Sequence, residues 1–557
     1  MLTLANRSKF STLLDALILT QPTDPRPAII FVRTGQPPVI VSRTQFHEQS
    51  ARYATALRQH GIQPRDLIII AHVQNLETIF AFWGALMMGA IPSIFPTLTE
   101  KLDPEIYINS VSQLVERSGV RAIFTTDEFA PRLAAHVNCP VLSSDRFDQQ
   151  PASWETAEPA ADEIAFLQHS SGTTGLQKGV ALSHCAVLNQ LASYSDSLNL
   201  NAADVIVSWL PLYHDMGLIA GFLLPLVQGL PLVIMSPFDW VSNPVLLLQA
   251  IDQFSGTLCW LPNFAYNHMA RRIRAADTDG LSLTTMRAFI NCSEPVRHDS
   301  HTQFIERFGD LGVTPDKLAV SYAMAENVFA VTQTRLGQPP ELDWIDREML
   351  ATQQVARQVS AGHTGAVTYV SCGQPIPGVS VRILGPQGDI LPERSVGEIA
   401  IKSNCLLTGY YRRDDLNPFT PDGWYRTGDM GYRAANAIYV IGRYKDLIIN
   451  AGKNIYPQDI EAIVNTIPGI HPGRVVAFGV PDEREGTELI AVVAEVDVAD
   501  PAQQREIGRQ IRQRVSQQSM AAVSVVQLVE PGWLIKTSSG KMARAANRDK
   551  WLKAFRR

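Results

Sequence analysis

The sequence lacks the features of a secreted disulfide-rich protein, of a cysteine-based metal site and of a nucleic-acid-binding protein. Its six cysteines include no Cys-x-x-Cys pair, so free thiols in a reducing compartment are expected. The net charge is only −6, which gives no reason to expect nucleic acid as a partner. The first residues show no cationic flank leading to an apolar segment and a small-residue cleavage site, and we therefore expect a cytoplasmic protein.

One uncharged stretch, residues 218–235, is long enough to cross a membrane. Pro225, Gly229 and Pro231 interrupt it, and such residues break a continuous helix. We predict a buried helix followed by a buried strand, and no stable membrane insertion.

At 557 residues the chain is too long for one hydrophobic core, and its 46% hydrophobic content is typical of a globular protein. Short β-branched runs alternate with helical patterns through the first 440 residues, which predicts an α/β fold with largely parallel sheets. Strands are expected at residues 66–71, 120–125, 205–210, 232–235 and 286–291, and a helix at 76–89.

The later part of the chain changes character. Residues 335–365 form a polar interruption, and from Val367 a strand-, glycine- and proline-rich pattern predicts a small sheet or distorted barrel up to about residue 440. After Gly442 the pattern strand, helix, strand, strand, helix, strand, helix predicts a separate small α+β domain.

Residues 168–179 read Gln-His-Ser-Ser-Gly-Thr-Thr-Gly-Leu-Gln-Lys-Gly, a loop suited to a polyphosphate. Gly172 and Gly175 let backbone N–H groups converge on an anion, and Lys178 supplies a positive charge. The hydroxyl donors are Ser170, Ser171, Thr173 and Thr174. The glycine spacing excludes a Walker A loop. A flexible Ser/Gly/Thr linker is the alternative for this segment alone.

The loop has strand patterns on both sides, residues 164–168 and 179–182, and Ser183 is expected to cap the following helix. A phosphate-binding loop between two strands differs from the P-loop of kinases and GTPases, which leads from a strand into a helix.

Further polar segments carry chemistry-bearing side chains, each modest alone. They are residues 209–217 with His214, 321–326 with Tyr322 and Glu326, 425–431 with Asp429, 441–448 with Arg443, and 536–541 with Lys541. An aromatic can stack on a base, a carboxylate can hold Mg²⁺ or a ribose, and a lysine can neutralise a phosphate. A core His–Asp pair and a solvent lysine are the structural alternatives.

Together and in this order, these segments resemble the adenylate-forming superfamily of acyl- and aryl-CoA synthetases, adenylation domains and luciferases. The nearer resemblance is to fatty acyl-AMP ligases. It rests on residues 209–217, 261–266, 291–297, 346–350, 370–377 and 452–461.

The resemblance implies an α/β fold with a large N-terminal domain of layered sheets and a small distorted barrel, at residues 1–441. A small, mobile α+β domain would follow at 442–557, with a hinge near Lys445 and an insertion at about 335–365. It further implies an acid–thiol ligase that uses ATP and Mg²⁺ to convert a medium- or long-chain fatty acid to acyl-AMP and pyrophosphate. The acyl group would then pass to the phosphopantetheine thiol of an acyl carrier protein.

The resemblance also assigns roles to residues. The phosphate loop would grip pyrophosphate through Thr173, Thr174, Gly175 and Lys178, and Mg²⁺ would lie on Glu326, with Thr174 as a second candidate ligand. Adenine would stack on Tyr322 within Tyr322-Ala323-Met324, with Ser293, Glu294 and Pro295 along its edge. Asp429 and Arg443 would hold the ribose. His214 would lie near the carboxylate, and Lys541 would bridge that carboxylate and the α-phosphate.

Two alternatives remain at this level: a ligase of the same fold that uses free CoA, and a non-catalytic lipid-binding homologue. The intact set of charged residues argues against the second. Residues 505–557 hold twelve Lys or Arg against three Asp or Glu, which suits an acidic carrier protein. The apolar candidates for the acyl pocket are Trp209, Met216, Phe264, Tyr266 and Met324.

Overall fold

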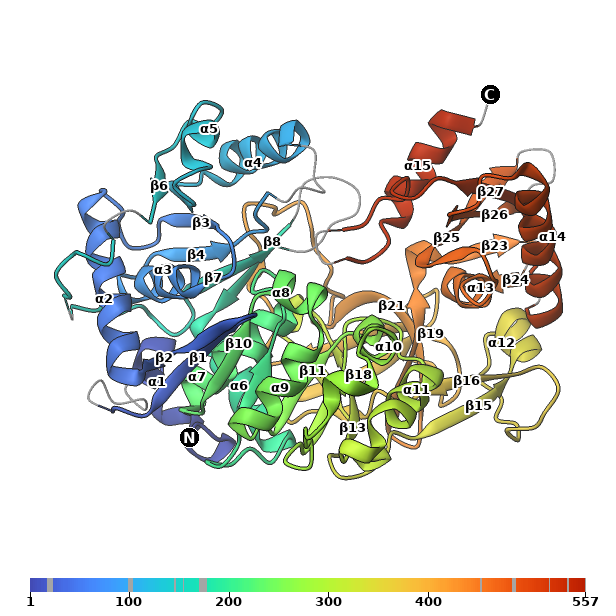
Figure 1. The fold of residues 1–557 in the computed structure, drawn as a ribbon, viewed down its shortest axis with the longest axis horizontal. Coiled ribbons are helices and arrows are strands. Elements are labelled where there is room, and N and C mark those ends of the chain that lie inside the picture. The colour runs from blue at the N-terminus through green and yellow to red at the C-terminus, as the bar shows by residue number, and fades with distance from the viewer. Residues whose placement is uncertain are drawn as a thin grey trace.

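A computed structural model describes residues 1–17, 24–98, 104–144, 147–153, 155–169, 178–450, 453–482, 487–519, 521–537 and 540–555 (Figure 1). Its centre is a nine-stranded sheet in the order β17-β14-β13-β12-β11-β9-β10-β1-β2. Strands β9 to β13 and β1 pair in parallel, as expected for an α/β fold, and antiparallel strands close both edges.

The strands of this sheet are β1 (Pro27–Arg33), β2 (Gln36–Ser42), β9 (Ile206–Ser208), β10 (Leu232–Met235), β11 (Leu258–Leu261), β12 (Ala288–Asn291), β13 (Leu318–Ala323), β14 (Ala330–Gln333) and β17 (Gln374–Pro375). The neighbouring helices are α1 (Leu13–Leu17), α6 (His184–Ser197), α7 (Leu224–Gln228), α8 (Pro237–Ser242), α9 (Val245–Phe254), α10 (Asn263–Arg272) and α11 (His298–Phe308).

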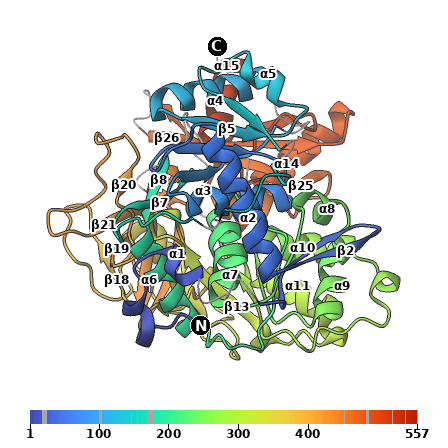
Figure 2. The same cartoon turned by 90° about the vertical axis from the view of Figure 1, so that its left-hand side faces the viewer.

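A second, parallel sheet has the order β4-β3-β5-β6. Its elements are β3 (Leu67–Ala71), β4 (Ile91–Ile94), β5 (Ala122–Thr125), β6 (Val141–Ser143), α2 (Arg43–Gln59), α3 (Leu76–Met87), α4 (Pro104–Ser118) and α5 (Ala130–Ala134). Helices α2 and α3 face the viewer in Figure 2. They approach so closely that a Cβ on Gly84 would lie 2.8 Å from the Ala54 nitrogen.

The strands that flank the phosphate loop, β7 (Ile164–His169) and β8 (Gly179–Ser183), pair with each other, and β8 also pairs with β20 (Gly409–Tyr410). The Ser183 side chain accepts a hydrogen bond from the Ala186 N–H and caps α6, as the sequence predicts.

The uncharged stretch at 218–235 folds as a π-helix (Met216–Leu223), α7 and β10, all buried. This agrees with the prediction of a buried helix followed by a buried strand. No helix in the described part of the chain combines the length and apolarity needed to cross a bilayer.

A smaller antiparallel sheet, β18-β19-β21-β22, follows the central one. Its strands are β18 (Val379–Leu384), β19 (Gly397–Ser403), β21 (Tyr425–Ala434) and β22 (Ala437–Arg443). The segment 335–365 is more ordered than a polar interruption suggests. It holds β15 (Leu342–Asp346), which pairs with β16 (Ala366–Val370), and α12 (Arg347–Gln353), whose Leu350 is buried.

The C-terminal unit lies at the upper right of Figure 1, opposite the sheet that contains β3. Its elements are β23 (Ile448–Asn450), β24 (Lys453–Ile455), α13 (Pro457–Val464), β25 (Ile470–Asp482), β26 (Thr487–Val496), α14 (Pro501–Gln518), β27 (Val523–Val529) and α15 (Arg544–Phe555). The hairpin β23–β24 adds one strand to the predicted order.

One core cluster of this unit draws its buried members only from described residues between 448 and 523. Another apolar cluster joins Tyr456 to Ile345 and Leu350 of the 335–365 segment and to Tyr432 of the smaller sheet. The 335–365 segment therefore packs against both the C-terminal unit and the smaller sheet. The domain boundary near residue 442 stays a prediction.

Candidate functional site

Three of the residues predicted to bind the nucleotide lie together in one hydrogen-bonded group. Asp429 and Arg443 are partners across β21 and β22, and Tyr322 lies near the end of β13. The Tyr322 hydroxyl donates to Asp429 Oδ2 at 2.7 Å, and Arg443 Nε lies 3.2 Å from Oδ1. Asp429 raises the pKa of Arg443, although burial opposes this. The group presents an aromatic ring, a carboxylate and a guanidinium side by side.

Glu326 lies in a short 3₁₀ turn (Ala325–Asn327) beside two tyrosines that sequence reasoning missed. The Tyr410 hydroxyl lies 3.1 Å from Glu326 Oε1 and 3.0 Å from the Tyr425 hydroxyl. Burial raises the pKa of Glu326, despite the Tyr410 hydrogen bond and the attraction of Arg443. Pairing of β20 with β8 positions Tyr410, a relation invisible in the sequence.

Lys178, which ends the phosphate loop, has its Nζ 4.9 Å from the centre of the Tyr410 ring. Ser170, Ser171, Gly172, Thr173, Thr174 and Gly175 lie outside the described residues. On the other side of the loop, the buried His169 ring bonds to the Ser93 hydroxyl at 2.7 Å. Burial lowers the pKa of His169 to about 4, so this ring is neutral at pH 7.

His214 and Asp215 stand at the start of the π-helix, a distortion often found at functional sites. His214 Nδ1 lies 2.6 Å from Asp215 Oδ1, and the Met216 N–H donates to the same oxygen at 2.8 Å. A Cβ on Gly217 would lie 2.1 Å from the Pro211 carbonyl oxygen, so only glycine allows this tight turn.

Lys541 reaches this group from the C-terminal unit. Burial opposes ionisation of Asp215, but interactions with His214 and Lys541 outweigh it and lower the pKa of Asp215. Lys541 also interacts with the buried thiol of Cys292, whose pKa burial raises to about 12. The Lys541 N–H donates to Thr537 Oγ1 at 3.1 Å, which ties the lysine into its loop.

The predicted adenine edge, Ser293 to Pro295, directly follows Cys292. Ser293 has a φ of 73°, a left-handed conformation rare for serine. The Glu294 carboxylate accepts a hydrogen bond from the Phe264 N–H at 2.9 Å, at the first turn of α10. This contact occupies the Glu294 side chain, while Pro295 is exposed.

The five apolar candidates for the acyl pocket lie in three different surroundings. The Trp209 ring stacks on Trp240 with centroids 3.6 Å apart, and Phe264 meets Trp209 edge-on at 6.0 Å. Met216 and Met324 are buried beside the polar groups described above. Tyr266 instead packs against His301 and Phe304 of α11, so core packing accounts for it. Trp240 was missed because its segment carries no recognisable motif.

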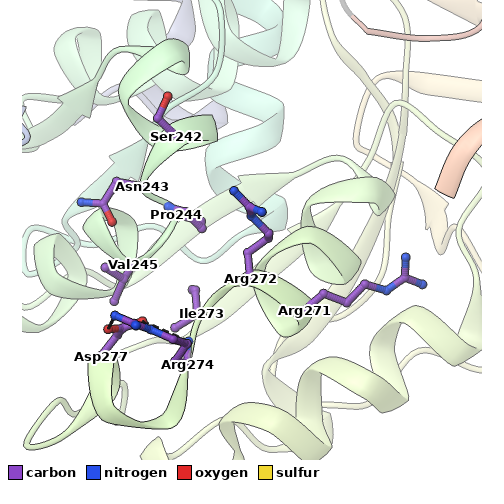
Figure 3. Close-up of a pocket in the computed structure, with 9 residues that line it drawn as sticks. All are labelled: Ser242, Asn243, Pro244, Val245, Arg271, Arg272, Ile273, Arg274 and Asp277. Atoms are coloured by element: carbon purple, nitrogen blue, oxygen red, sulfur yellow. Dashed lines mark hydrogen bonds and ion pairs between the residues drawn. The ribbon is translucent and has the colours of Figure 1, made fainter. Parts of the chain in front are cut away.

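A surface pocket of about 330 Å³ lies apart from these residues, between α8, the start of α9 and the end of α10 (Figure 3). It is lined by Ser242, Asn243, Pro244, Val245, Arg271, Arg272, Ile273, Arg274 and Asp277. Arg274 is paired with Asp277 at 2.8 Å, and Arg271 points away from the others. None of the predicted site residues lines it.

Among the described residues, no group of three or more His, Cys, Asp or Glu side chains is arranged to hold a metal. Mg²⁺ usually needs only one or two carboxylates because substrate phosphates supply further ligands. The Glu326 carboxylate fits that requirement.

Comparisons with known proteins agree with this geometry. A family model described as "AMP-binding enzyme" matches residues 20–411. The long-chain-fatty-acid–AMP ligase FadD26 of Mycobacterium marinum is 32% identical, over 90% of each chain. The medium-chain-fatty-acid–[acyl-carrier-protein] ligase JamA of Moorena producens is 29% identical, over 98% of this chain and 96% of its own.

Solved structures give the same answer. One from a study of fatty acyl-adenylate ligases of E. coli and L. pneumophila has a TM-score of 0.90 at 29% identity, covering 99% of both chains. A fatty acid AMP ligase from Legionella pneumophila has a TM-score of 0.75 at 27% identity, covering 99% of this chain and 97% of its own. The chain therefore belongs to the AMP-binding enzyme family and, within it, to the fatty acyl-AMP ligases.

Proposed function

We propose that this ligase activates a medium- or long-chain fatty acid with ATP and then transfers the acyl group to the phosphopantetheine thiol of an acyl carrier protein. A carboxylate oxygen attacks the α-phosphorus of ATP, the bond to the bridging oxygen breaks, and pyrophosphate leaves. In the second step the thiol sulfur attacks the acyl carbon, AMP leaves with the bonding electrons, and the thiol proton passes to solvent.

The observation that carries the proposal is the position of Lys541. It comes from the C-terminal unit, yet its charge acts on Asp215 and Cys292, beside His214 and Ser293. A cation at this place suits a reaction in which negative charge develops on phosphate oxygens. Lys541 would therefore stabilise the reacting carboxylate and the α-phosphate.

The other residues have complementary roles. Tyr322 would stack on adenine beside the 293–295 turn, and Asp429 with Arg443 would accept and donate hydrogen bonds to the ribose. Lys178 and the preceding loop would hold the departing pyrophosphate. No covalent protein nucleophile is needed for either step.

Glu326 would hold Mg²⁺ together with the ATP phosphates. Bound there, the ion neutralises phosphate charge. The hydrogen bond from Tyr410 fixes one carboxylate oxygen of Glu326 and leaves the other for the metal.

The aromatic group Trp209, Trp240 and Phe264 and the buried Met216 and Met324 supply apolar side chains for the acyl group of the acid. Apolar walls favour an aliphatic chain over a charged or hydroxylated acid. The similarity to JamA, which is named as an acyl-carrier-protein ligase, supports a carrier protein as the acceptor. Free CoA is the second candidate, because a 29% identical relative is named a putative fatty-acid–CoA ligase.

Release of pyrophosphate from ATP with a panel of acids tests the first half-reaction. We expect turnover with saturated medium- or long-chain acids and little with aryl acids or amino acids. Absence of pyrophosphate release with every fatty acid, or a preference for aryl acids, would contradict the proposal.

A further inference from the structure

The C-terminal unit is held against the larger part of the chain by a polar contact outside the predicted site. Arg297, which precedes α11, donates through Nη2 to the Gln458 carbonyl oxygen at 2.9 Å. The same guanidinium lies 3.4 Å from Asp459 Oδ1. Both acceptors belong to the first turn of α13. The Arg297 side chain therefore binds the first turn of α13 in the C-terminal unit.

Arg297 is itself fixed by the loop that carries the predicted adenine edge. Its N–H donates to Asn263 Oδ1 at 3.0 Å, and Asn291 donates to the same oxygen at 3.1 Å. Glu294, three residues earlier, bonds to the Phe264 N–H. The guanidinium thus projects from a backbone that is tied to α10 at Arg297 itself and through the Glu294 side chain.

On the other side of the contact, α13 leads directly to Lys541. Its Glu461 binds Arg544 through both carboxylate oxygens, at 2.8 and 3.0 Å. Arg544 follows Lys541 by three residues and also binds Asp446, beside the predicted hinge residue Lys445, at 2.6 Å. A continuous series of contacts therefore runs from Arg297 through α13 and Arg544 to Lys541.

The contact is half-buried, and burial raises the pKa of Asp459 although Arg297 attracts its carboxylate. The Arg297 and Asp459 side chains are 34% and 28% exposed, and Gln458 is packed so closely that a Cβ on Gly442 would lie 2.5 Å from its Nε2. Arg347 of α12 adds a second positive charge that acts on Asp459. Removing one partner from a half-buried, charge-assisted contact is costly.

We propose that Arg297 is a positioning residue for adenylate formation, which holds α13 and, through Arg544, keeps the Lys541 loop in its place against the larger part of the chain. The inference rests on the proposed function, since it presumes two half-reactions. Because the contact joins the two units, it must break before the C-terminal unit can turn for acyl transfer. Loss of Arg297 should therefore slow the first half-reaction and spare the second.

The test measures the half-reactions separately. Arg297→Met keeps the length of the side chain but removes its charge and donors. We expect the rate of acyl-AMP formation, measured as pyrophosphate release, to fall about 10- to 100-fold. This is the range for the loss of a hydrogen bond to a charged group. Transfer from supplied acyl-AMP to a holo carrier protein should be unchanged or faster. Arg297→Lys should recover part of the first rate.

Two further variants keep the test decisive if Arg297→Met folds poorly. Asp459→Asn should show the same split, and the double variant should be no slower than Arg297→Met alone, because Arg297→Met already removes the contact with Asp459. Arg382→Met is the matched control, since Arg382 pairs with Asp422 at 2.9 Å within the smaller sheet region. It should leave both half-reactions unchanged.

Provided that the wild-type protein is active, either of two results would overturn the inference. One is an equal loss of both half-reactions, and the other is an unchanged rate of acyl-AMP formation in both Arg297→Met and Asp459→Asn. A wild-type protein that releases no pyrophosphate with any fatty acid would instead overturn the proposed function, and the inference with it.

Discussion

Among single residues, charged side chains from distant segments of the chain act on one another. Glu326 interacts with Arg443 and Asp215, and Asp215 with Lys541. Lys445 interacts with Arg443 and Lys178, and these like charges together with burial lower the pKa of Lys445. Such mutual effects require that all these side chains lie in one region.

Lys541→Ala should lower the rate of acyl-AMP formation about 10²- to 10³-fold, the usual effect of removing one preorganised donor from a transition state. ATP binding should remain close to wild type, since Tyr322, Asp429 and Arg443 are untouched. Single-turnover pyrophosphate release and a nucleotide-binding titration would measure the two quantities. A variant with the full rate would refute the role given to Lys541.

Glu326→Gln should increase the free energy of unfolding at pH 7 while lowering activity. The raised pKa of Glu326 means that the folded state disfavours its ionised form relative to the unfolded state. The destabilisation is complete at pH values above the pKa of Glu326 in the folded protein, and it is absent at pH values below the ordinary pKa of 4.5. Thermal unfolding of both proteins between pH 4 and pH 8 should thus show a stability difference that disappears in acid. A difference independent of pH would contradict the assignment.

The same pKa shift should affect activity in the opposite sense. Glu326 must be ionised to hold a cation, so the Mg²⁺ requirement should rise as the pH falls through its raised pKa.

At the scale of elements, Lys445 lies in a 3₁₀ turn (Tyr444–Asp446) between β22 and β23. Such a turn has φ near −60°, which the proline ring also imposes. Lys445→Pro should therefore permit acyl-AMP formation and slow acyl transfer, because it resists rotation at this point. Lys445→Ala, which keeps the backbone free, is the control. Equal loss of both steps in the proline variant would argue against a hinge here.

The 335–365 segment is better tested by a point change than by deletion. Leu350 is 3% exposed and shares a cluster with Tyr456 of the C-terminal unit, so deletion would uncover a core. Leu350→Ala should cost about 2–5 kcal/mol of unfolding free energy and loosen this contact.

The resemblance to fatty acyl-AMP ligases implies that this segment disfavours the CoA-bound arrangement, and we therefore expect the change to increase AMP release with free CoA. Leu133→Ala, buried in another cluster, should cost similar stability without changing the acceptor. If both variants respond alike to CoA, the segment has no specific role.

Elements with strong local patterns could be predicted from the sequence. The prediction of a strand at 232–235 matches β10, and that of a helix at 76–89 matches α3 within two residues. β15 and α12 were missed because charged residues such as Asp346 and Arg347 obscure their apolar positions. Asp346 caps α12 by accepting from the Glu348 and Met349 N–H groups, a cap visible only once the helix is known.

At the scale of the whole molecule, the order of the segments predicted the family, but pairing between distant strands decided the site. Tyr410 lies beside Glu326 because β20 pairs with β8, and no local pattern encodes that. Arg297 and Asp459 lie 162 positions apart, and their contact depends on how the C-terminal unit sits. Sequence reasoning found the charged residues and missed the side chains that hold them.

The arrangement also explains why two half-reactions can share one site. The C-terminal unit, which carries Lys541, contacts the larger part of the chain through Arg297, through Gln458 Nε2, which donates to the Ile441 carbonyl oxygen, and through the cluster around Tyr456. Contacts of this size can be exchanged without unfolding either part.

The most direct test of the central claim is mass spectrometry of a holo acyl carrier protein incubated with the ligase, ATP, Mg²⁺ and a fatty acid, with free CoA as competitor. We predict that the carrier gains the mass of one acyl group on its phosphopantetheine, that Lys541→Ala slows this gain about 10²- to 10³-fold, and that little acyl-CoA forms. Acyl-CoA accumulation with an unmodified carrier would contradict this prediction.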